Sequence, residues 1–244
     1  MSVRPAPYLS LVLACYNEAE HLEASFAEIR KTLEQTTWPF EVIFIDDQSR
    51  DRTPELLQAI VARHPELDLR LILHQQNRGR GATVSEGFRA ARGRIAGYID
   101  IDLEVHCRYI PALARAIEEG ADIATVRRIY ALQVLALDRY LMSRGYSWLV
   151  RRLLGLPFHD TETGYKLFRR ETVLPLLDEI EDGGWFWDTE FMARAARRGL
   201  KVAEIPGAYI RREDKTSTVR GLRDSARYFL ALLRFRRRLR REAP

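Results

Sequence analysis

Three carboxylates alternate with apolar residues in YIDIDLE, which spans residues 98–104. On a strand, Asp100, Asp102 and Glu104 would share one face, because successive side chains of a strand point to opposite faces. Neighbouring carboxylates repel one another and resist burial. A divalent cation such as Mg²⁺ or Mn²⁺ would neutralise them through the hard oxygen ligands that these ions prefer. The alternative is a solvated loop at the end of a strand, so the surrounding segments must decide.

The surrounding chain alternates between strand-like and helix-like stretches. We expect strands at 9–16, 40–49, 67–73, 94–102, 121–126, 163–170 and 201–206. Helical patterns lie at 18–35, from Thr53 onward, and at 81–91, 108–119, 131–154 and 188–199. This alternation predicts an α/β fold with a mainly parallel sheet flanked by helices. We interpret residues 1–219 as a single domain and residues 220–244 as a C-terminal extension.

Four of the predicted strands end in polar residues. These ends are Tyr16-Asn17-Glu18, Asp46-Asp47, Gln75-Gln76-Asn77 and Asp100-Ile101-Asp102. Ligands of parallel sheets bind beyond the carboxyl ends of the strands, so we expect one site at this edge. An acidic cluster that binds Mg²⁺ or Mn²⁺ usually holds a polyphosphate. No G-x-x-x-x-G-K-[ST] loop is present, and no G-x-G-x-x-G follows the first strand, which argues against the sites built on those motifs.

Positive charge is concentrated at the end of the chain. The whole chain carries +5, whereas residues 220–244 contain nine Arg, no Lys and two acids, a net of +7, which leaves −2 for residues 1–219. A nucleic-acid-binding domain is expected to be basic over one face. We therefore expect no nucleic-acid partner.

The basic end has the pattern of an amphipathic helix over residues 221–241. The expected apolar face contains Leu222, Ala226, Phe229 and Leu233, and the expected basic face Arg223, Arg227, Arg234 and Arg238. Such a helix can lie on an anionic membrane surface. The alternative is that its apolar face packs on the domain.

Cysteine usage and hydropathy bear on the compartment. Cys15 and Cys107 are far apart and lack the spacing of metal ligands, which fits two buried thiols in a reducing compartment. No apolar run approaches the roughly 20 residues that span a bilayer, and the first residues do not form a signal peptide. We expect a cytoplasmic protein.

Six motifs in order resemble those of family-2 glycosyltransferases with the GT-A fold, and within them the polyprenyl-phosphate, dolichol-phosphate-mannose synthase-like branch. ACYNE (14–18) resembles P-x-Y-N-E, and IDDQSRDRT (45–53) resembles D-D-G-S-x-D-x-T. NRGRGATVSEGFRAARG (77–93) is similar to N-x-G-K-G-x-x-x-x-x-G, and YIDIDLE to D-x-D-L-Q. DTETGYKLFRR (160–170) resembles D-T-x-x-G-F-K-L-F-R-R, and FWDTEF (186–191) resembles F-D-x-E. The resemblance runs from about Leu9 to Val219 and implies a Rossmann-like GT-A catalytic domain.

The resemblance implies a site for a nucleoside diphosphate sugar. Asp100 and Asp102 would hold Mg²⁺ or Mn²⁺ on the diphosphate, with Glu104 at the position of the family's Gln as a third metal ligand. Tyr16, Glu18, Asp46 and Asp47 would hold the nucleobase and ribose. The full set implied for the nucleotide sugar is Ala14, Tyr16, Glu18, Asp46, Asp47, Arg80, Asp100, Ile101 and Asp102.

The resemblance also implies an acceptor site. Arg128 and Arg144 match arginines that face the acceptor phosphate, and Arg212 and Lys215 would assist them. A phosphate monoester, with a second pKa of about 6, is already a nucleophile at neutral pH and needs cationic positioning more than a base. Asp188 is the base that we expect if the acceptor is a hydroxyl group. Its alternative role is the N-cap of the helix at 188–199.

Four positions depart from the family motifs. Ala14 replaces a common Pro, Gln48 replaces Gly, and Ser147 replaces Asn. After Arg212 the family's Ser-Lys pair is not present in that order, because Lys215 precedes Ser217. The last departure falls in the expected phosphate-binding region.

The leading hypothesis is a metal-dependent, inverting hexosyltransferase. It would move a hexose from a donor such as GDP-mannose or UDP-glucose to dolichyl or undecaprenyl phosphate, at the cytoplasmic face of a membrane. A second hypothesis keeps the fold but transfers the sugar to a hydroxyl group of a glycan or small molecule. A third is a non-catalytic, basic-tailed adaptor for membranes or nucleic acid. A membrane-spanning partner and a homodimer both remain open.

Overall fold

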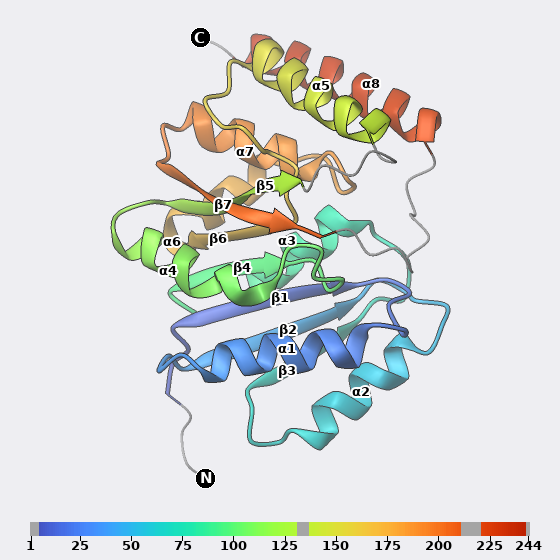
Figure 1. Ribbon diagram of the computed structural model, residues 1–244, viewed down its shortest axis with the longest axis vertical. Helices are drawn as coiled ribbons and strands as arrows, with labels where there is room; N and C mark the ends of the chain where they lie inside the picture. Colours follow the sequence, from blue (N-terminus) through green and yellow to red (C-terminus); the bar gives the residue numbers. More distant parts are fainter. Residues whose placement is uncertain (1–4, 131–136, 211–220, 243–244) are drawn as a thin grey trace.

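The computed structural model describes residues 5–130, 137–210 and 221–242, with side chains from residue 145 onward in the second range and from 227 onward in the third (Figure 1). The strands are β1 (Leu9–Cys15), β2 (Phe40–Asp46), β3 (Leu69–Leu73), β4 (Ile95–Ile99), β5 (Ile123–Tyr130), β6 (Tyr165–Arg169) and β7 (Val202–Tyr209). The α-helices are α1 (Leu22–Glu34), α2 (Thr53–Arg63), α3 (Arg80–Ala90), α4 (Ile110–Glu118), α5 (Leu137–Leu154), α6 (Arg170–Val173), α7 (Trp187–Arg197) and α8 (Gly221–Arg241). Short 3₁₀ helices, η1 (Cys107–Tyr109) and η3 (Leu174–Glu179), complete the described elements.

The strands form one sheet in the order β3-β2-β1-β4-β6-β5-β7. The neighbouring pairs are parallel except those of β6, which runs antiparallel to both β4 and β5. The α/β architecture with a mainly parallel sheet is therefore confirmed. The direction of β6 could not be read from its sequence, because an apolar strand has the same pattern in either orientation.

Helices cover both faces of the sheet (Figure 1), and buried apolar side chains form a hydrophobic layer on each face. One contains buried side chains of α1, α2 and α4, and the other contains those of α3, η3 and α7. Helix α4 illustrates the cause: Ile110, Leu113, Ala114 and Ile117 are fully buried, at the i, i+3, i+4, i+7 spacing of one helical face. The layers pack against a sheet in which the carboxyl ends of the described strands other than β6 lie at one edge.

Strands β5 and β7 extend beyond the rest of the sheet. The pairing of β5 with β6 ends at Thr125. The pairing of β5 with β7 continues as far as Tyr130 and Tyr209. Arg128 therefore stands on a two-stranded parallel extension rather than within the sheet. This extension borders the carboxyl edge of the sheet.

Helices α5 and α8 lie side by side at one end of the molecule (Figure 1). Leu232 and Phe235 of α8 are buried, and Tyr228 packs against Tyr146 of α5 with ring centroids 5.2 Å apart. The buried face of α8 therefore differs from the apolar face expected from the sequence, since Phe229 is 42% exposed. The expected Leu222 and Ala226 lie outside the described side chains. The inward face is set by the rings of Tyr146 and Phe186, which helix periodicity alone does not reveal.

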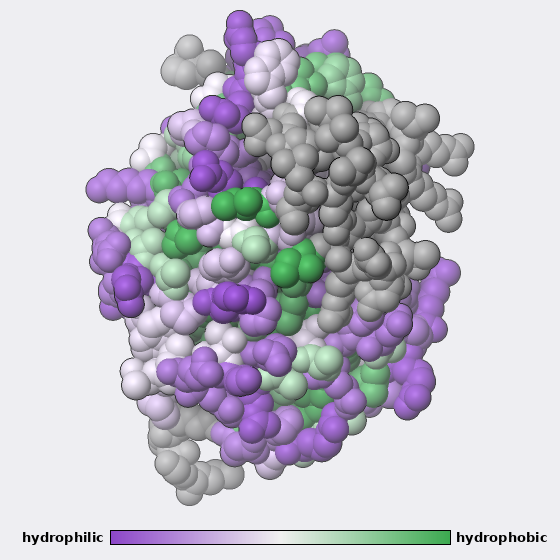
Figure 2. All heavy atoms as spheres, viewed as in Figure 1, coloured by the Kyte–Doolittle hydropathy of each residue, from purple (hydrophilic) through white to green (hydrophobic). Residues whose placement is uncertain are grey.

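Both cysteines are buried free thiols, as expected. Within the described part of the chain, no helix combines the length and the apolar character needed to cross a bilayer. On the face shown in Figure 2, hydrophilic residues predominate and hydrophobic residues form small separate patches.

Candidate active site

The acidic segment after β4 is a turn and not a strand. β4 ends at Ile99, and the turn closes with a hydrogen bond of 3.2 Å from Leu103 N to Asp100 O. Leu103 has a φ of +53°. The expectation that three carboxylates share one strand face is therefore wrong. The apolar residues of the segment still anchor it, because Ile101 is buried in the core and Leu103 packs against it.

The carboxylates of the turn diverge. Glu104 accepts a hydrogen bond of 2.6 Å from the Tyr209 hydroxyl on β7. Among the described residues, no cluster of three acidic, His or Cys side chains is positioned to hold a metal ion. Asp100 and Asp102 remain close enough for the charge of Asp102 to act on Asp100.

Arg80, the first residue of α3, joins Asp100 to Asp188 of α7. Its Nε and Nη2 donate to Asp100 Oδ1 over 3.1 and 2.7 Å, and its Nη1 donates to Asp188 Oδ2 over 2.6 Å. The guanidinium also lies 5.2 Å from the ring centroid of Tyr98 and 5.4 Å from that of Trp185. Arg80 thus supplies a fixed positive charge beside the expected metal site.

Asp188 is buried and held by cations on two sides. Besides Arg80, Lys166 Nζ of β6 donates to Asp188 Oδ1 over 2.7 Å, and the Tyr98 hydroxyl donates to the same oxygen. Burial alone would raise the pKa of Asp188, but Lys166 and Arg80 lower it. Asp188 is not the N-cap that we considered, because α7 begins at Trp187 and its N-cap is Phe186.

The charge state of Asp100 is set by opposing effects. Burial raises the pKa of Asp100, and so do the carboxylates of Asp102 and Asp188. Arg80 lowers this pKa, but the net shift is upward. Two mutually repelling carboxylates on one turn, with oxygen as the only donor atoms, fit a hard divalent cation. Asp100 and Asp102 are the residues that would hold it. Glu104 does not fit in this arrangement, because its carboxylate faces Tyr209.

The carboxyl ends of β1 and β2 lie next to that of β4 at the same edge of the sheet. Asp46 Oδ2 accepts from Ser49 N over 2.9 Å, while its Oδ1 is buried without a hydrogen-bond partner among the described residues. Tyr16 follows β1 and is 38% exposed, and Ala14 is partly buried on β1 itself. A buried acceptor oxygen with no partner is costly, so a ligand donor at Asp46 would remove that penalty.

The carboxylate of Asp47 has a structural task, while its expected contact with the nucleobase and ribose stays a prediction. Its carboxylate accepts from the backbone N–H groups of Arg78 and Gly79, over 2.8 and 2.9 Å, and contacts His74 Nδ1 at 2.8 Å. These bonds fix the loop that leads into α3 and therefore the position of Arg80. Glu18 lies at the end of β1, where its backbone N–H donates to Thr53 Oγ1 over 2.8 Å.

The side chain of Gln48 joins two loops at the same edge of the sheet. Its φ is +61°, the left-handed region that glycine adopts most readily, and it stands where the resembled motif has Gly. The side chain compensates with two hydrogen bonds: Nε2 donates to Gln75 O and Oε1 accepts from Asn77 N, both over 3.0 Å. The departure from the motif thus ties the loop after β2 to the loop after β3.

Arg128 forms the cationic part of the site on the β5–β7 extension. Its Nε and Nη2 donate to the two oxygens of Asp160 over 2.7 and 2.9 Å. The guanidinium packs against one side of the ring pair formed by Tyr130 and Tyr209, 5.7 and 5.8 Å from their centroids. These contacts fix the orientation of the guanidinium beside the carboxylates of Asp160 and Glu162.

Two residues of the site were missed by sequence reasoning. Lys166 is fully buried yet pairs with Asp188, and Glu162 lies 3.9 Å from Arg128 Nη2 with its side chain 22% exposed. Both lie inside the quoted segment DTETGYKLFRR, where Lys166 occupies a motif position and Glu162 a variable one. A lysine in the middle of an apolar strand was the available signal.

Three of the expected acceptor residues cannot be placed. Arg212 and Lys215 lie outside the described residues, and Arg144 lies in α5 but outside the described side chains. Of the two tryptophans that flank Phe186, Trp187 is buried and stacks on Phe191, whereas Trp185 is 53% exposed next to Arg80.

Comparison with known sequences identifies relatives. A sequence profile described as Glycosyl transferase family 2 matches residues 10–174. Glycosyltransferase AglD of Haloferax volcanii is 38% identical over 208 residues, which cover 81% of this chain and 32% of that protein. A dolichyl-phosphate beta-glucosyltransferase of Dictyostelium discoideum is 26% identical over 212 residues, covering 81% of this chain and 65% of the relative. The chain thus spans about a third of the first protein and just under two thirds of the second.

Comparison with solved structures supports the same fold. Glucosyl-3-phosphoglycerate synthase from Mycobacterium tuberculosis, in complex with Mn²⁺, UDP and glucosyl-3-phosphoglycerate, superposes with a TM-score of 0.67. The two chains are 21% identical, and the match covers 94% of this chain and 80% of the other. At this identity the likeness establishes the GT-A fold.

Proposed function

Since the chain belongs to glycosyl transferase family 2, we propose that it transfers a glucosyl residue from UDP-glucose to a polyprenyl phosphate, with the help of a divalent cation. Between the two donors that the sequence left open, the name of the Dictyostelium relative favours glucose. The observation that carries the proposal is a connected set of charges. It runs from the Asp100 turn through Arg80 and Asp188 to Lys166.

The donor would bind at the carboxyl ends of β1, β2 and β4. Asp46 Oδ1 offers an unused buried acceptor for an N–H group of the base. Asp100 and Asp102 would hold Mg²⁺ or Mn²⁺, which supplies charge stabilisation to the departing diphosphate. Arg80 adds a fixed cation beside the same turn. Ala14 on β1 and Tyr16 and Glu18 after it remain predicted donor contacts.

The acceptor phosphate would lie beside Arg128. An oxygen of the phosphate forms the new bond to the anomeric carbon as the bond from that carbon to the diphosphate breaks, and the electron pair leaves with the diphosphate. Direct displacement inverts the anomeric centre. The chain contributes orientation, because Arg128 is held by Asp160 and packs against the rings of Tyr130 and Tyr209. Arg144, Arg212 and Lys215 remain predicted partners of the phosphate.

The surroundings of Asp188 favour a phosphate over a hydroxyl acceptor. A hydroxyl nucleophile needs a base whose pKa lies near the working pH. The pKa of Asp188 is lowered, and both of its oxygens are occupied by Arg80, Lys166 and Tyr98. A phosphate monoester is largely deprotonated at neutral pH and has less need of such a base.

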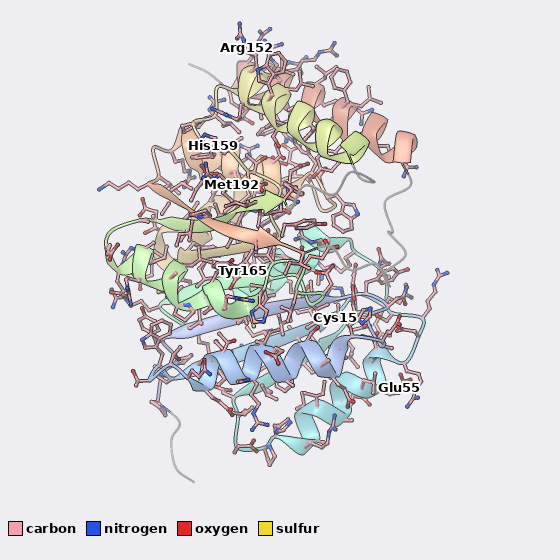
Figure 3. The ribbon with its side chains drawn as sticks, in the orientation of Figure 1. Cys15, Glu55, Arg152, His159, Tyr165 and Met192 are labelled. Carbon is pink, nitrogen blue, oxygen red and sulfur yellow. The ribbon has the colours of Figure 1, made fainter. Side chains whose placement is uncertain are left out.

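We also propose that the end formed by α5 and α8 faces a membrane. Trp148 on α5 is 64% exposed, and Phe229 and Leu230 on α8 are 42% and 50% exposed. Exposed arginines accompany them, including Arg152, which projects outward from α5 in Figure 3. Apolar and aromatic side chains interspersed with arginine are suited to an anionic lipid surface.

Calorimetry tests the donor half of this proposal. The full chain is titrated with UDP, GDP, CDP and dTDP, each with and without Mn²⁺. We expect UDP to bind tightly only with Mn²⁺, and Asp102→Asn to lose this dependence.

Transfer of glucose from UDP-glucose to farnesyl phosphate, with farnesol as the control acceptor, then tests the acceptor half. Transfer to farnesol and not to farnesyl phosphate would contradict the phosphate assignment.

A further inference from the structure

Glu162 has no close ionic partner among the described residues: its contact with Arg128 Nη2 is 3.9 Å long. Arg128 lies closer to Asp160, at 2.7 Å, than to Glu162, at 3.9 Å. Lys166 pairs with Asp188 at 2.7 Å. Among the described residues, no hydrogen bond reaches the Glu162 carboxyl oxygens. Its backbone N–H donates to Asp160 Oδ1 over 3.2 Å, which holds the residue at this position.

Charged or titratable groups of several described elements act on Glu162. β5 contributes Arg128, β6 Lys166, α7 Asp188, α5 Tyr146 and α8 Tyr228, and Asp160 precedes Glu162 in its own segment. Both cations of this set already have a nearer carboxylate. An ionised Glu162 would therefore be a surplus negative charge beside the arginine that is to receive a phosphate.

We propose that Glu162 binds the acceptor phosphate as a neutral carboxylic acid, donating a hydrogen bond to a phosphate oxygen beside Arg128. This inference rests on the proposed function and identifies a further acceptor residue. In the neutral form the surplus charge is absent. The neutral carboxyl group can then donate a hydrogen bond to the phosphate, next to the bonds that Arg128 donates.

The protonation balance supports this role. Burial raises the pKa of Glu162 to about 7, with a further increase from Asp160 and Asp188 and an opposing effect of Arg128 and Lys166. The second pKa of a phosphate monoester is about 6. The carboxyl group therefore holds its proton more tightly than the phosphate does, so that near neutrality the phosphate is the more fully ionised of the two. The arriving dianion would raise the carboxyl pKa further, because a neighbouring like charge disfavours ionisation.

Proton uptake on binding tests the proposal. Farnesyl phosphate is titrated into the full chain, loaded with UDP and Mn²⁺, at pH 8 in buffers of different ionisation enthalpy. The wild type is expected to take up close to one proton per phosphate bound, because Glu162 must be protonated. Glu162→Gln should bind with no such uptake, since an amide donates without titrating. Glu171→Gln, an exposed carboxylate on α6, should behave as the wild type.

The pH profile supplies a second readout. For the wild type, kcat/KM for farnesyl phosphate should fall above about pH 7 as Glu162 ionises. Glu162→Gln should lose this alkaline decline and retain activity at pH 8. Binding without proton uptake in the wild type, or the same alkaline decline in Glu162→Gln, would overturn the inference while leaving a phosphate acceptor intact.

Failure of the proposed function has a different signature. If farnesyl phosphate does not bind while farnesol accepts glucose, the phosphate acceptor and the role of Glu162 are both refuted. In that case activity should rise above pH 7, because an ionised Glu162 would accept the hydroxyl proton, and Glu162→Gln should lose activity. The direction of the Glu162→Gln effect at pH 8 therefore separates the two outcomes.

Discussion

Gly164 lies directly against the carboxylate of Asp100, so that a β-carbon added to Gly164 would overlap it. The backbone joins the same pair, since Asp100 N donates to Gly164 O over 2.9 Å. The turn that presents the candidate metal ligand is therefore shaped by the absence of a side chain on the first residue before β6.

Gly164→Ala should displace the Asp100 carboxylate. We expect Mn²⁺-dependent binding of UDP to weaken on the order of tenfold or more, as for other losses of metal-ligand geometry. Calorimetry with and without Mn²⁺ measures the effect. Gly145→Ala on α5 is the matched control, because nothing lies within 4 Å of the added carbon. Equal UDP affinities in the two variants would show that Asp100 does not need its present position.

Arg80→Gln should change how the protein binds Mn²⁺ in the absence of nucleotide. Arg80 occupies Asp100 and Asp188 in this structure, so removal of its charge leaves a more negative site for the cation. We expect the affinity for Mn²⁺ alone to rise several-fold, as followed by the electron paramagnetic resonance signal of free Mn²⁺. Arg89→Gln, on the exposed side of the same helix, should leave it unchanged. A weaker affinity in Arg80→Gln would mean that Arg80 organises the turn rather than competes with the metal.

Asp188→Asn should destabilise the fold, because it removes the ionic partner of the fully buried Lys166. Loss of one partner of a buried pair costs about 3–5 kcal/mol. Urea denaturation measures the change in the free energy of unfolding. The double variant Lys166→Met/Asp188→Asn should be less destabilised than Asp188→Asn alone, since it leaves no unpaired ammonium group. If the double variant is the less stable of the two, Lys166 has other contacts that matter more.

Glu162→Gln should stabilise the protein increasingly as the pH rises. The folded-state pKa of about 7 exceeds the ordinary value of 4.5, so the fold favours the neutral form. That contribution is fully present below pH 4.5 and disappears as the pH rises through 7 in the wild type. The stability difference between Glu162→Gln and the wild type should therefore grow by roughly 2 kcal/mol from pH 5 to pH 8. The free energy of unfolding is measured for both proteins by urea denaturation at pH 5 and pH 8. The same difference between the two proteins at both pH values would contradict a raised pKa of Glu162.

The sequence predicted the elements better than the contacts between their side chains. Apolar periodicity and strand-end polarity located the sheet and its carboxyl edge, and the ordered motifs indicated the family. Alternation of Asp100, Asp102 and Glu104 misled, because it cannot distinguish the end of a strand from the turn that follows. Asp188 was recognised as important, but its pairing with Lys166 and Arg80 required the antiparallel placement of β6 beside β4. Glu162 occupies a variable position of its motif, and its environment includes side chains of β5, α7 and α8, which are distant from it in sequence.

Gln48 links the loops after β2 and β3, because its side chain bonds to Gln75 O and to Asn77 N. The two loops are therefore held in a fixed position relative to each other, which lowers the entropy that would be lost on ordering them around a ligand. The left-handed backbone of Gln48 is the structural cost of this link, and a glycine here would remove the link and leave a more flexible pair of loops.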